Sequence, residues 1–334
     1  MHQIVLFFLF SSALCACGGP APRTTLLRVP SVGEVDSQAT AIGVNDFVVA
    51  AADAFQPCVF TRVTIGLGDE SLSTRLGFST HQCGTIAGFE GVLWVAYTPA
   101  DWGRPVVQRV DFGKTPPKAS EVLSEVMGQL PIETEPGRLF ATGPTTLWHL
   151  GDIVQRSDDG GASWIKIDII GYSRSLYRAL GTSNGSVYVA SLGLFRVQGV
   201  TATRVETGIY SVKSLHGDVV VGSDVGKLAI GRLDGDRVIW DPVDPDWGEI
   251  KFAWSRGNVI RLLSRPEMDS PADVASGPEY RARRNGGSWG STSLGYAASP
   301  PIAVYGVDPL GNALIPRVHQ NIWYLPANDG VAGD

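Results

Sequence analysis

Two cysteines far from the N-terminus, Cys58 and Cys83, have the clearest chemistry in this 334-residue chain. In an oxidising compartment such a pair forms a disulfide, and in a reducing one it stays as two buried thiols. Residues 4–14 favour the oxidising compartment, because this terminal apolar run is too short for a permanent membrane span and is typical of a secretory signal. We therefore predict a Cys58–Cys83 bridge, whose loop of about 25 residues stabilises the fold by roughly 3–4 kcal/mol. Two free thiols are the alternative.

The apolar run ends in Leu14-Cys15-Ala16-Cys17-Gly18-Gly19, which resembles the lipobox of bacterial lipoproteins. The resemblance implies cleavage after Ala16 and acylation of Cys17, so that the protein is held on membrane lipid. Gly18 stands where Asp retains such proteins at the inner membrane, and this favours the outer membrane of a bacterial cell envelope. Met1-His2-Gln3 lacks the usual Lys or Arg. An ordinary cleaved signal or an uncleaved anchor is therefore the alternative.

The lipobox interpretation divides the chain into three parts. Residues 1–16 are expected to be a lipoprotein signal peptide, and residues 17–24, which are rich in Gly and Pro, a tether. Residues 25–334 are expected to form a single domain.

Composition excludes several classes of protein. The net charge is −6, with 27 basic and 33 acidic residues, and this argues against nucleic acid as a partner, because phosphate binding needs a clustered basic surface. A hydrophobic fraction of 44% with 9% aromatic residues excludes a disordered chain. The five His are scattered and metal-ligand spacings are absent, so we expect no metal and no cofactor.

Three local patterns could suggest chemistry but have simpler explanations. Residues 181–185 match the Gly-x-Ser-x-Gly string of hydrolases, but Asn184-Gly185 leads directly into a strand and predicts a hairpin turn. The acid-rich segment 241–249 lacks EF-hand-type spacing and is interpreted as a solvated loop. Trp102 and Trp247 lie outside the strand patterns and are candidates for exposed rings that stack on a sugar or peptide. No catalytic residue is assigned.

The body of the chain repeats a unit of an apolar strand, a turn and a second apolar strand. The turns fall at Asp46, Gly91, Thr145, Gly185, Asp218, Asn258 and Gly311. Most units continue with a third strand and several with a fourth, and units of about 40–45 residues with four strands are typical of propeller blades. We predict an all-β fold, a seven-bladed β-propeller of four-stranded antiparallel blades. A two-sheet sandwich is the alternative.

Residues 157–164, Ser-Asp-Asp-Gly-Gly-Ala-Ser-Trp, form the most specific motif of the chain. The segment resembles the Asp-box of BNR-repeat propellers, a superfamily with sialidases, sortilin-like receptors and reaction-centre assembly factors. The resemblance assigns structural roles to Ser157, Asp159, Gly161, Ser163 and Trp164. The Asp159 carboxylate would accept hydrogen bonds within the turn, Gly161 would supply a positive φ, and the Trp164 ring would be buried. The Arg-Ile-Pro motif of sialidases is absent, which argues against that activity.

Two segments interrupt the repeat. Residues 117–130 place Val122, Val126 and Leu130 four residues apart, which predicts a helical insertion. Residues 267–278 are predicted to be a second insertion, a mobile loop.

The expected function is that of a binding module on the cell envelope, because loops from all blades of a propeller converge around the axis. The ligand, a protein or a glycan, is not specified by the sequence, since function depends on those loops and not on the fold. A carbohydrate-active enzyme, a hydrolase or lyase with carboxylates in the channel, is the second hypothesis. An assembly factor for a membrane complex is the third.

Overall fold

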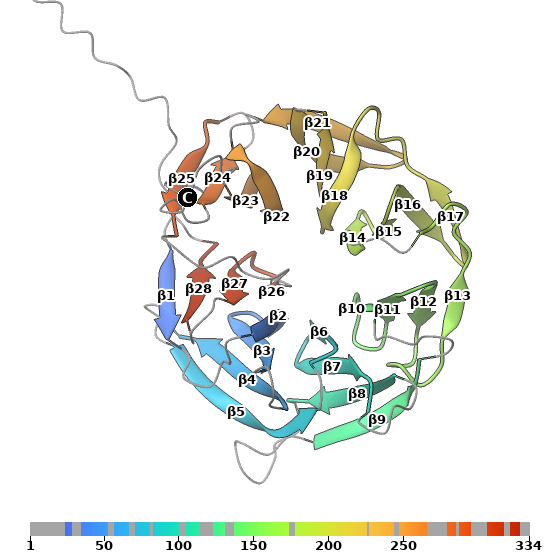
Figure 1. The fold of residues 1–334 in the computed structure, drawn as a ribbon, viewed down its shortest axis with the longest axis vertical. Helices are drawn as coiled ribbons and strands as arrows, with labels where there is room; N and C mark the ends of the chain where they lie inside the picture. Colours follow the sequence, from blue (N-terminus) through green and yellow to red (C-terminus); the bar gives the residue numbers. More distant parts are fainter. Residues whose placement is uncertain are drawn as a thin grey trace, which may run out of the picture.

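The computed structural model describes residues 24–28, 35–52, 57–66, 71–80, 83–99, 105–113, 123–130, 137–173, 178–225, 227–243, 247–265, 279–284, 287–294, 306–316 and 321–327. Within these ranges the chain is all-β and forms seven four-stranded antiparallel sheets. The sheets stand as blades around a central axis, with one strand of each blade innermost and another at the rim (Figure 1). The predicted seven-bladed propeller is confirmed.

Six blades follow the order of the sequence from the inner strand to the rim. Blade 1 is β2 (Val35–Gly43), β3 (Asp46–Ala52), β4 (Cys58–Ile65) and β5 (Ser71–Thr80); blade 2 is β6 (Thr85–Phe89), β7 (Val92–Tyr97), β8 (Val106–Asp111) and β9 (Leu123–Gln129). Blade 3 is β10 (Arg138–Ala141), β11 (Leu147–Leu150), β12 (Val154–Ser157) and β13 (Ile165–Ile167); blade 4 is β14 (Ala179–Ser183), β15 (Ser186–Ala190), β16 (Leu194–Gln198) and β17 (Thr201–Arg204). Blade 5 is β18 (Ser211–His216), β19 (Val219–Asp224), β20 (Lys227–Asp234) and β21 (Arg237–Val243); blade 6 is β22 (Glu249–Arg256), β23 (Val259–Arg265), β24 (Glu279–Arg284) and β25 (Gly290–Ser293).

Blade 7 joins the two ends of the chain. Its inner strands are β26 (Gly306–Val307), β27 (Ala313–Pro316) and β28 (Asn321–Leu325), and its rim strand is β1 (Thr25–Arg28) from the N-terminal end. β1 pairs with β28 antiparallel, with Thr25 opposite Tyr324 and Arg28 opposite Asn321. This closure, which the repeat pattern did not predict, hydrogen-bonds the start of the domain to its end and completes the ring.

The hydrophobic core lies between the blades. Alternate residues of β3 point to opposite sides, so that Phe47 and Val49 pack against blade 7 while Val48 and Ala50 pack against blade 2. A blade is therefore buried on both faces, and its second strand is a continuous apolar run. Neighbouring inner strands approach closely: a Cβ at Gly88 would lie 2.2 Å from the Ala41 carbonyl oxygen.

The predicted turns join the first and second strands of the blades. Asn184 and Gly185 connect β14 to β15 with φ of 48° and 74°, the conformation of the hairpin turn that Asn-Gly favours. This places the hydrolase-like string in a hairpin, as predicted.

The helix predicted at 117–130 is wrong for the residues that the structure describes. Its described part, Leu123–Gln129, is strand β9, which pairs with β8 at the rim of blade 2. A spacing of four residues fits one side of a strand as well as one side of a helix, because four is an even number. The backbone groups on the open edge of β8 need hydrogen-bond partners, and this favours a strand over a helix for the segment. The second insertion, 267–278, lies outside the described residues.

Cys58 and Cys83 form the predicted disulfide, with their Cα atoms 4.9 Å apart. Cys58 begins β4, and Cys83 lies in the connection from β5 to β6. The bridge therefore ties the start of blade 2 to an interior strand of blade 1. Both side chains are buried. No helix in the described part of the chain has the length and hydropathy needed to cross a membrane.

Candidate functional site

The strand order gives the ring two different faces. The turns between first and second strands, and between third and fourth strands, emerge on one side, which we call the hairpin face. The turns between second and third strands and the connections from blade to blade emerge on the other, the loop face. On the hairpin face adjacent blades are hydrogen-bonded: Gly91 N donates to Ile42 O (2.6 Å), and Thr182 N donates to Gly217 O (2.9 Å).

Two arginines meet at the loop-face end of blades 3 and 4. Arg138 is the first residue of β10, and Arg178 directly precedes β14, so both lie where an inner strand begins. The Arg138 Nη1 group donates to the backbone carbonyl of Arg178 (3.0 Å), and Arg178 Nη1 donates to the carbonyl of Leu150 (2.9 Å). We call Arg138 and Arg178 the arginine pair.

The arginine pair concentrates positive charge at a half-buried position. Burial and then the neighbouring charge of Arg178 lower the pKa of Arg138. Among the described residues Arg138 has no carboxylate partner. Its Nη1 group donates to the Arg178 carbonyl, and the other N–H groups of its guanidinium are the donors that a ligand would use. Two such groups suit a carboxylate or a phosphate, which guanidinium binds through paired N–H bonds.

A buried side-chain network supports the strand that begins with Arg138. His149 is fully buried in β11, and its Nδ1 lies 3.3 Å from Gln155 Oε1. A Cβ at Gly137 would lie only 2.5 Å from His149 Nε2, and Gly137 has a φ of 53°. Only glycine fits there, because it has no side chain to clash with the imidazole. The backbone can therefore pass close to His149 just before β10 begins.

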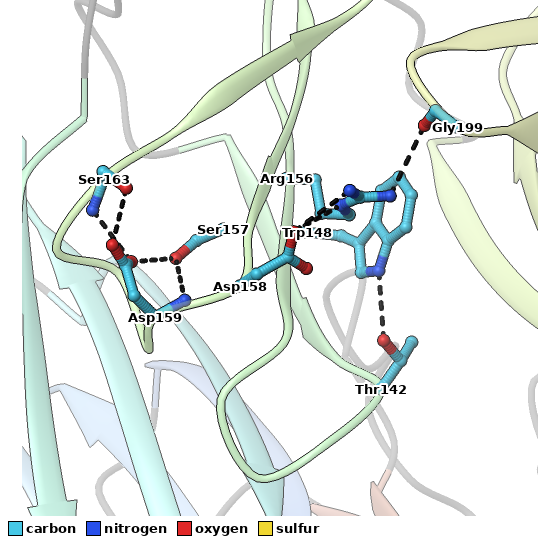
Figure 2. Close-up of polar contacts among 8 residues, drawn as sticks. All are labelled: Thr142, Trp148, Arg156, Ser157, Asp158, Asp159, Ser163 and Gly199. Atoms are coloured by element: carbon cyan, nitrogen blue, oxygen red, sulfur yellow. Dashed lines mark hydrogen bonds and ion pairs between the residues drawn. The ribbon is translucent and has the colours of Figure 1, made fainter.

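The Ser157–Trp164 turn lies on the hairpin face of the same blade, between β12 and β13 (Figure 2). The Asp159 carboxylate accepts hydrogen bonds from the hydroxyls of Ser157 (2.8 Å) and Ser163 (2.5 Å) and from the Ser163 amide (2.9 Å). These bonds, the Ser163 hydroxyl first, lower the pKa of Asp159 to about 2. Gly161 has a φ of 105°. The half-buried Trp164 ring donates to Gly161 O and packs against the core between blades 2 and 3. The contacts of this turn are therefore internal to the fold.

Arginines of the third strands of blades 3, 4 and 5 each contact the next blade. In Figure 2 the Arg156 guanidinium lies over the Trp148 ring, 5.8 Å from its centroid, and donates to Asp158 and to the Gly199 carbonyl of blade 4. Arg196 of blade 4 reaches Asp236 of blade 5 in the same way (3.2 Å). Arg232 of blade 5 reaches the Gly257 carbonyl of blade 6 (3.3 Å). An Arg in the third strand of successive units is a sequence signal for such a contact.

The remaining predicted site residues are not gathered around the arginine pair. Trp247 lies between blades 5 and 6, half-buried, with its ring 5.1 Å from that of Trp289 and the Arg281 guanidinium 4.5 Å from its centroid. Protein groups thus occupy part of its surface, and its role as a ligand contact stays a prediction. Cys17 and Trp102 lie outside the described residues. Within the described ranges no group of His, Cys, Asp and Glu could hold a metal ion.

A buried polar network at the junction of blades 7 and 1 was missed from the sequence. Asp308 is 4% exposed and accepts hydrogen bonds from the backbone amides of Asn45 (2.8 Å), Leu310 (2.8 Å) and Asn312 (2.9 Å). The side-chain amide of Asn312 donates from Nδ2 to Asn45 Oδ1 (2.8 Å). The same Asn45 oxygen accepts a hydrogen bond from the Tyr324 hydroxyl (2.9 Å). These side chains close the ring at its inner edge, as β1 closes it at the rim.

The arginine pair was missed as well. Its signal is an Arg at the start of the inner strand in two consecutive repeats, Arg138-Leu139 and Arg178-Ala179.

No protein-family profile and no curated protein matches this chain. Solved structures do match. A structure described as YCF48 bound to D1 peptide aligns with 12% identity and a TM-score of 0.57, over 94% of this chain and 99% of the other. YCF48 from Cyanidioschyzon merolae aligns with 11% identity and a TM-score of 0.57, over 90% and 98%. At these identities the likeness shows the fold, a seven-bladed propeller, and not a shared function.

Proposed function

We propose that this protein is an exported, lipid-anchored propeller that binds a protein partner, and that the arginine pair holds a carboxylate of that partner. The observation that carries the proposal is the juxtaposition of two cations at the inner edge of the ring. Arg138 donates to the Arg178 carbonyl, Arg178 donates to the carbonyl of Leu150 in β11, and the charge of Arg178 acts on Arg138. Two adjacent cations repel each other, and an anion between them removes that repulsion. Like charges that a rigid fold holds close together, with a shifted pKa, are typical of binding sites.

A peptide is a better ligand than a free small anion. The strand order places the pair on the face where one blade is connected to the next, and an extended chain suits a site that lies at the junction of two blades. The similar structure that is described as YCF48 bound to D1 peptide supports a peptide ligand for a ring of this shape. Each charge-assisted hydrogen bond contributes about 1.5–3 kcal/mol, so the loss of one arginine weakens binding roughly tenfold to hundredfold.

The cellular setting of the proposal comes from the sequence. The residues around Cys17 support a lipoprotein of the outer membrane, and the internal bonds of Asp159 support an Asp-box of the BNR type. An oxidising compartment also accounts for the Cys58–Cys83 disulfide.

An array of short synthetic peptides tests the binding site. The peptides are made in matched pairs, with Asp or Asn at one position and with a free or an amidated C-terminus. The fluorescently labelled domain is expected to prefer the member of a pair that carries the extra carboxylate. Arg138→Gln and Arg178→Gln are each expected to remove this preference.

Arg237→Gln is the matched control, because Arg237 is exposed on blade 5 and paired with Asp234. It removes the same charge and is expected to leave the preference intact. Equal binding of both members of every pair by the unaltered domain, or a preference that survives in both arginine-pair variants, would contradict the proposal.

A further inference from the structure

The direction of β1 shows on which face the chain enters the ring. Ala313 directly follows the hairpin-face turn of blade 7 and pairs with Leu325 of β28. Thr25 pairs with Tyr324, next to that end, whereas Arg28 pairs with Asn321 at the loop-face end. β1 therefore begins at the hairpin face, on the rim of blade 7, and Thr25 marks the entry point of the ring.

The chain between Cys17 and this entry point is short. Thr25 is the eighth residue after Cys17, so the intervening segment spans at most about 28 Å when fully extended. A lipid on Cys17 would keep the hairpin-face rim of blade 7 within that distance of the bilayer.

The arginine pair lies far from this entry point in two respects. It is on the loop face, because Arg138 and Arg178 begin inner strands. It is also on the opposite side of the ring from β1, at the junction of blades 3 and 4 (Figure 1). A ring that lies flat on its hairpin face and a ring that stands on the rim of blade 7 both hold the pair away from the lipid.

We infer that the anchored ring presents its hairpin face and the rim of blade 7 to its own bilayer, and that the arginine pair binds an anionic group in the aqueous compartment and not a headgroup of that bilayer. The inference rests on the proposed lipid anchor. The exposed carboxylates in the turns between third and fourth strands of the hairpin face are paired with arginines: Asp158 with Arg156, Asp234 with Arg237 and Asp236 with Arg196. The proposed tether, and not a net charge of these turns, therefore sets the distance of this face from the bilayer.

Fluorescence quenching in vesicles tests the orientation. A single label is placed on the acylated full-length protein at Val44→Cys or at Leu192→Cys. Val44 lies in the hairpin-face turn of blade 1, next to blade 7, and is 49% exposed; Leu192 lies in a loop-face turn of blade 4 and is 69% exposed. The vesicles carry lipid with a nitroxide on its headgroup. The label at residue 44 is expected to lose most of its emission, and the label at residue 192 to keep nearly all of it.

Two further measurements separate the possible failures. Cys17→Ser is expected to abolish acylation and flotation with vesicles. If mass spectrometry finds no acyl chains on the unaltered protein, the proposed lipid anchor is contradicted. Stronger quenching at residue 192 than at residue 44, in an acylated protein, would overturn the orientation and leave the binding site intact. Flotation of Cys17→Ser with phosphatidylglycerol vesicles that is lost in Arg138→Gln would also overturn the inference, because the pair would then bind lipid.

Discussion

Two aspartates close turns in this ring by accepting several hydrogen bonds, and they differ in exposure. Asp308 is buried at the junction of blades 7 and 1, where it accepts bonds from three backbone amides. Asp159 lies at the surface and accepts hydrogen bonds from two hydroxyls and one backbone amide of its own turn. The energetic consequences differ, because water replaces the lost partner only at the exposed site.

Asp308→Ala is expected to lower the free energy of unfolding by about 3 kcal/mol, because it leaves the buried amide of Asn312 and the partly buried amides of Asn45 and Leu310 without an acceptor. Urea unfolding measures the loss. Asp234→Ala removes an exposed carboxylate from the β20–β21 turn and is expected to cost about 0.5 kcal/mol or less. Equal losses in the two variants would contradict the role of Asp308.

Asp159→Asn is expected to change the pH dependence of stability. The pKa of Asp159 is about 2 in the fold, below its ordinary value of 3.8. A lowered pKa adds stability that is complete above the unfolded value and is lost as the pH falls toward the folded one, here between about pH 4 and pH 2. The loss is at most about 1 kcal/mol, because the carboxylate is exposed. Thermal unfolding from neutral to acid pH should show a stability difference between the two proteins that shrinks in this window; a constant difference would count against it.

The structural residues were easier to predict than the binding ones. Cys58, Cys83 and the Ser157–Trp164 turn carry signals of composition or local spacing. Arg138 and Arg178 lie 40 residues apart, and only the ring geometry brings their strands together. Asp308 and Asn45 lie 263 residues apart, and no local pattern could connect them.

Among the elements, hairpins with tight turns were predicted well, because Asn-Gly and similar pairs restrict the backbone locally. Strand β9 was not predicted, because the spacing of Val126 and its neighbours fits a helix and a strand equally well. Only the pairing with β8 favours the strand. Strand β1 carries too little pattern in four residues to show that it pairs with β28. Both failures concern rim strands, whose conformation depends on the rest of the blade.

The disulfide acts at the level of elements, because it joins β4 to the connection that leads into β6. Cys58→Ala/Cys83→Ala is expected to lower the free energy of unfolding by roughly 3 kcal/mol. Reductant should destabilise the unaltered protein by a similar amount and leave the double variant unchanged. Alkylation of both cysteines in the denatured, unreduced mature protein would show that the bridge is absent.

At the scale of the whole molecule, one strand performs two tasks. β1 completes blade 7 at the rim, and it receives the chain from the proposed anchor. The closed ring is what holds Arg138 and Arg178 at a fixed separation, since each belongs to a different blade. Both proposals therefore depend on closure through β1 and β28.

A cross-link between β1 and β28 tests this closure most directly. Leu27 and Ile322 are register partners, so Leu27→Cys/Ile322→Cys places two thiols within reach of a short bismaleimide. Leu27→Cys/Ile239→Cys is the control, because Ile239 lies on the rim of blade 5 and is 56% exposed. With Cys17→Ser as background, we predict an internal cross-link, seen as a shift in gel mobility, in the first pair and none in the second. Equal cross-linking of the two pairs, or none in either, would contradict a ring closed by its N-terminal strand.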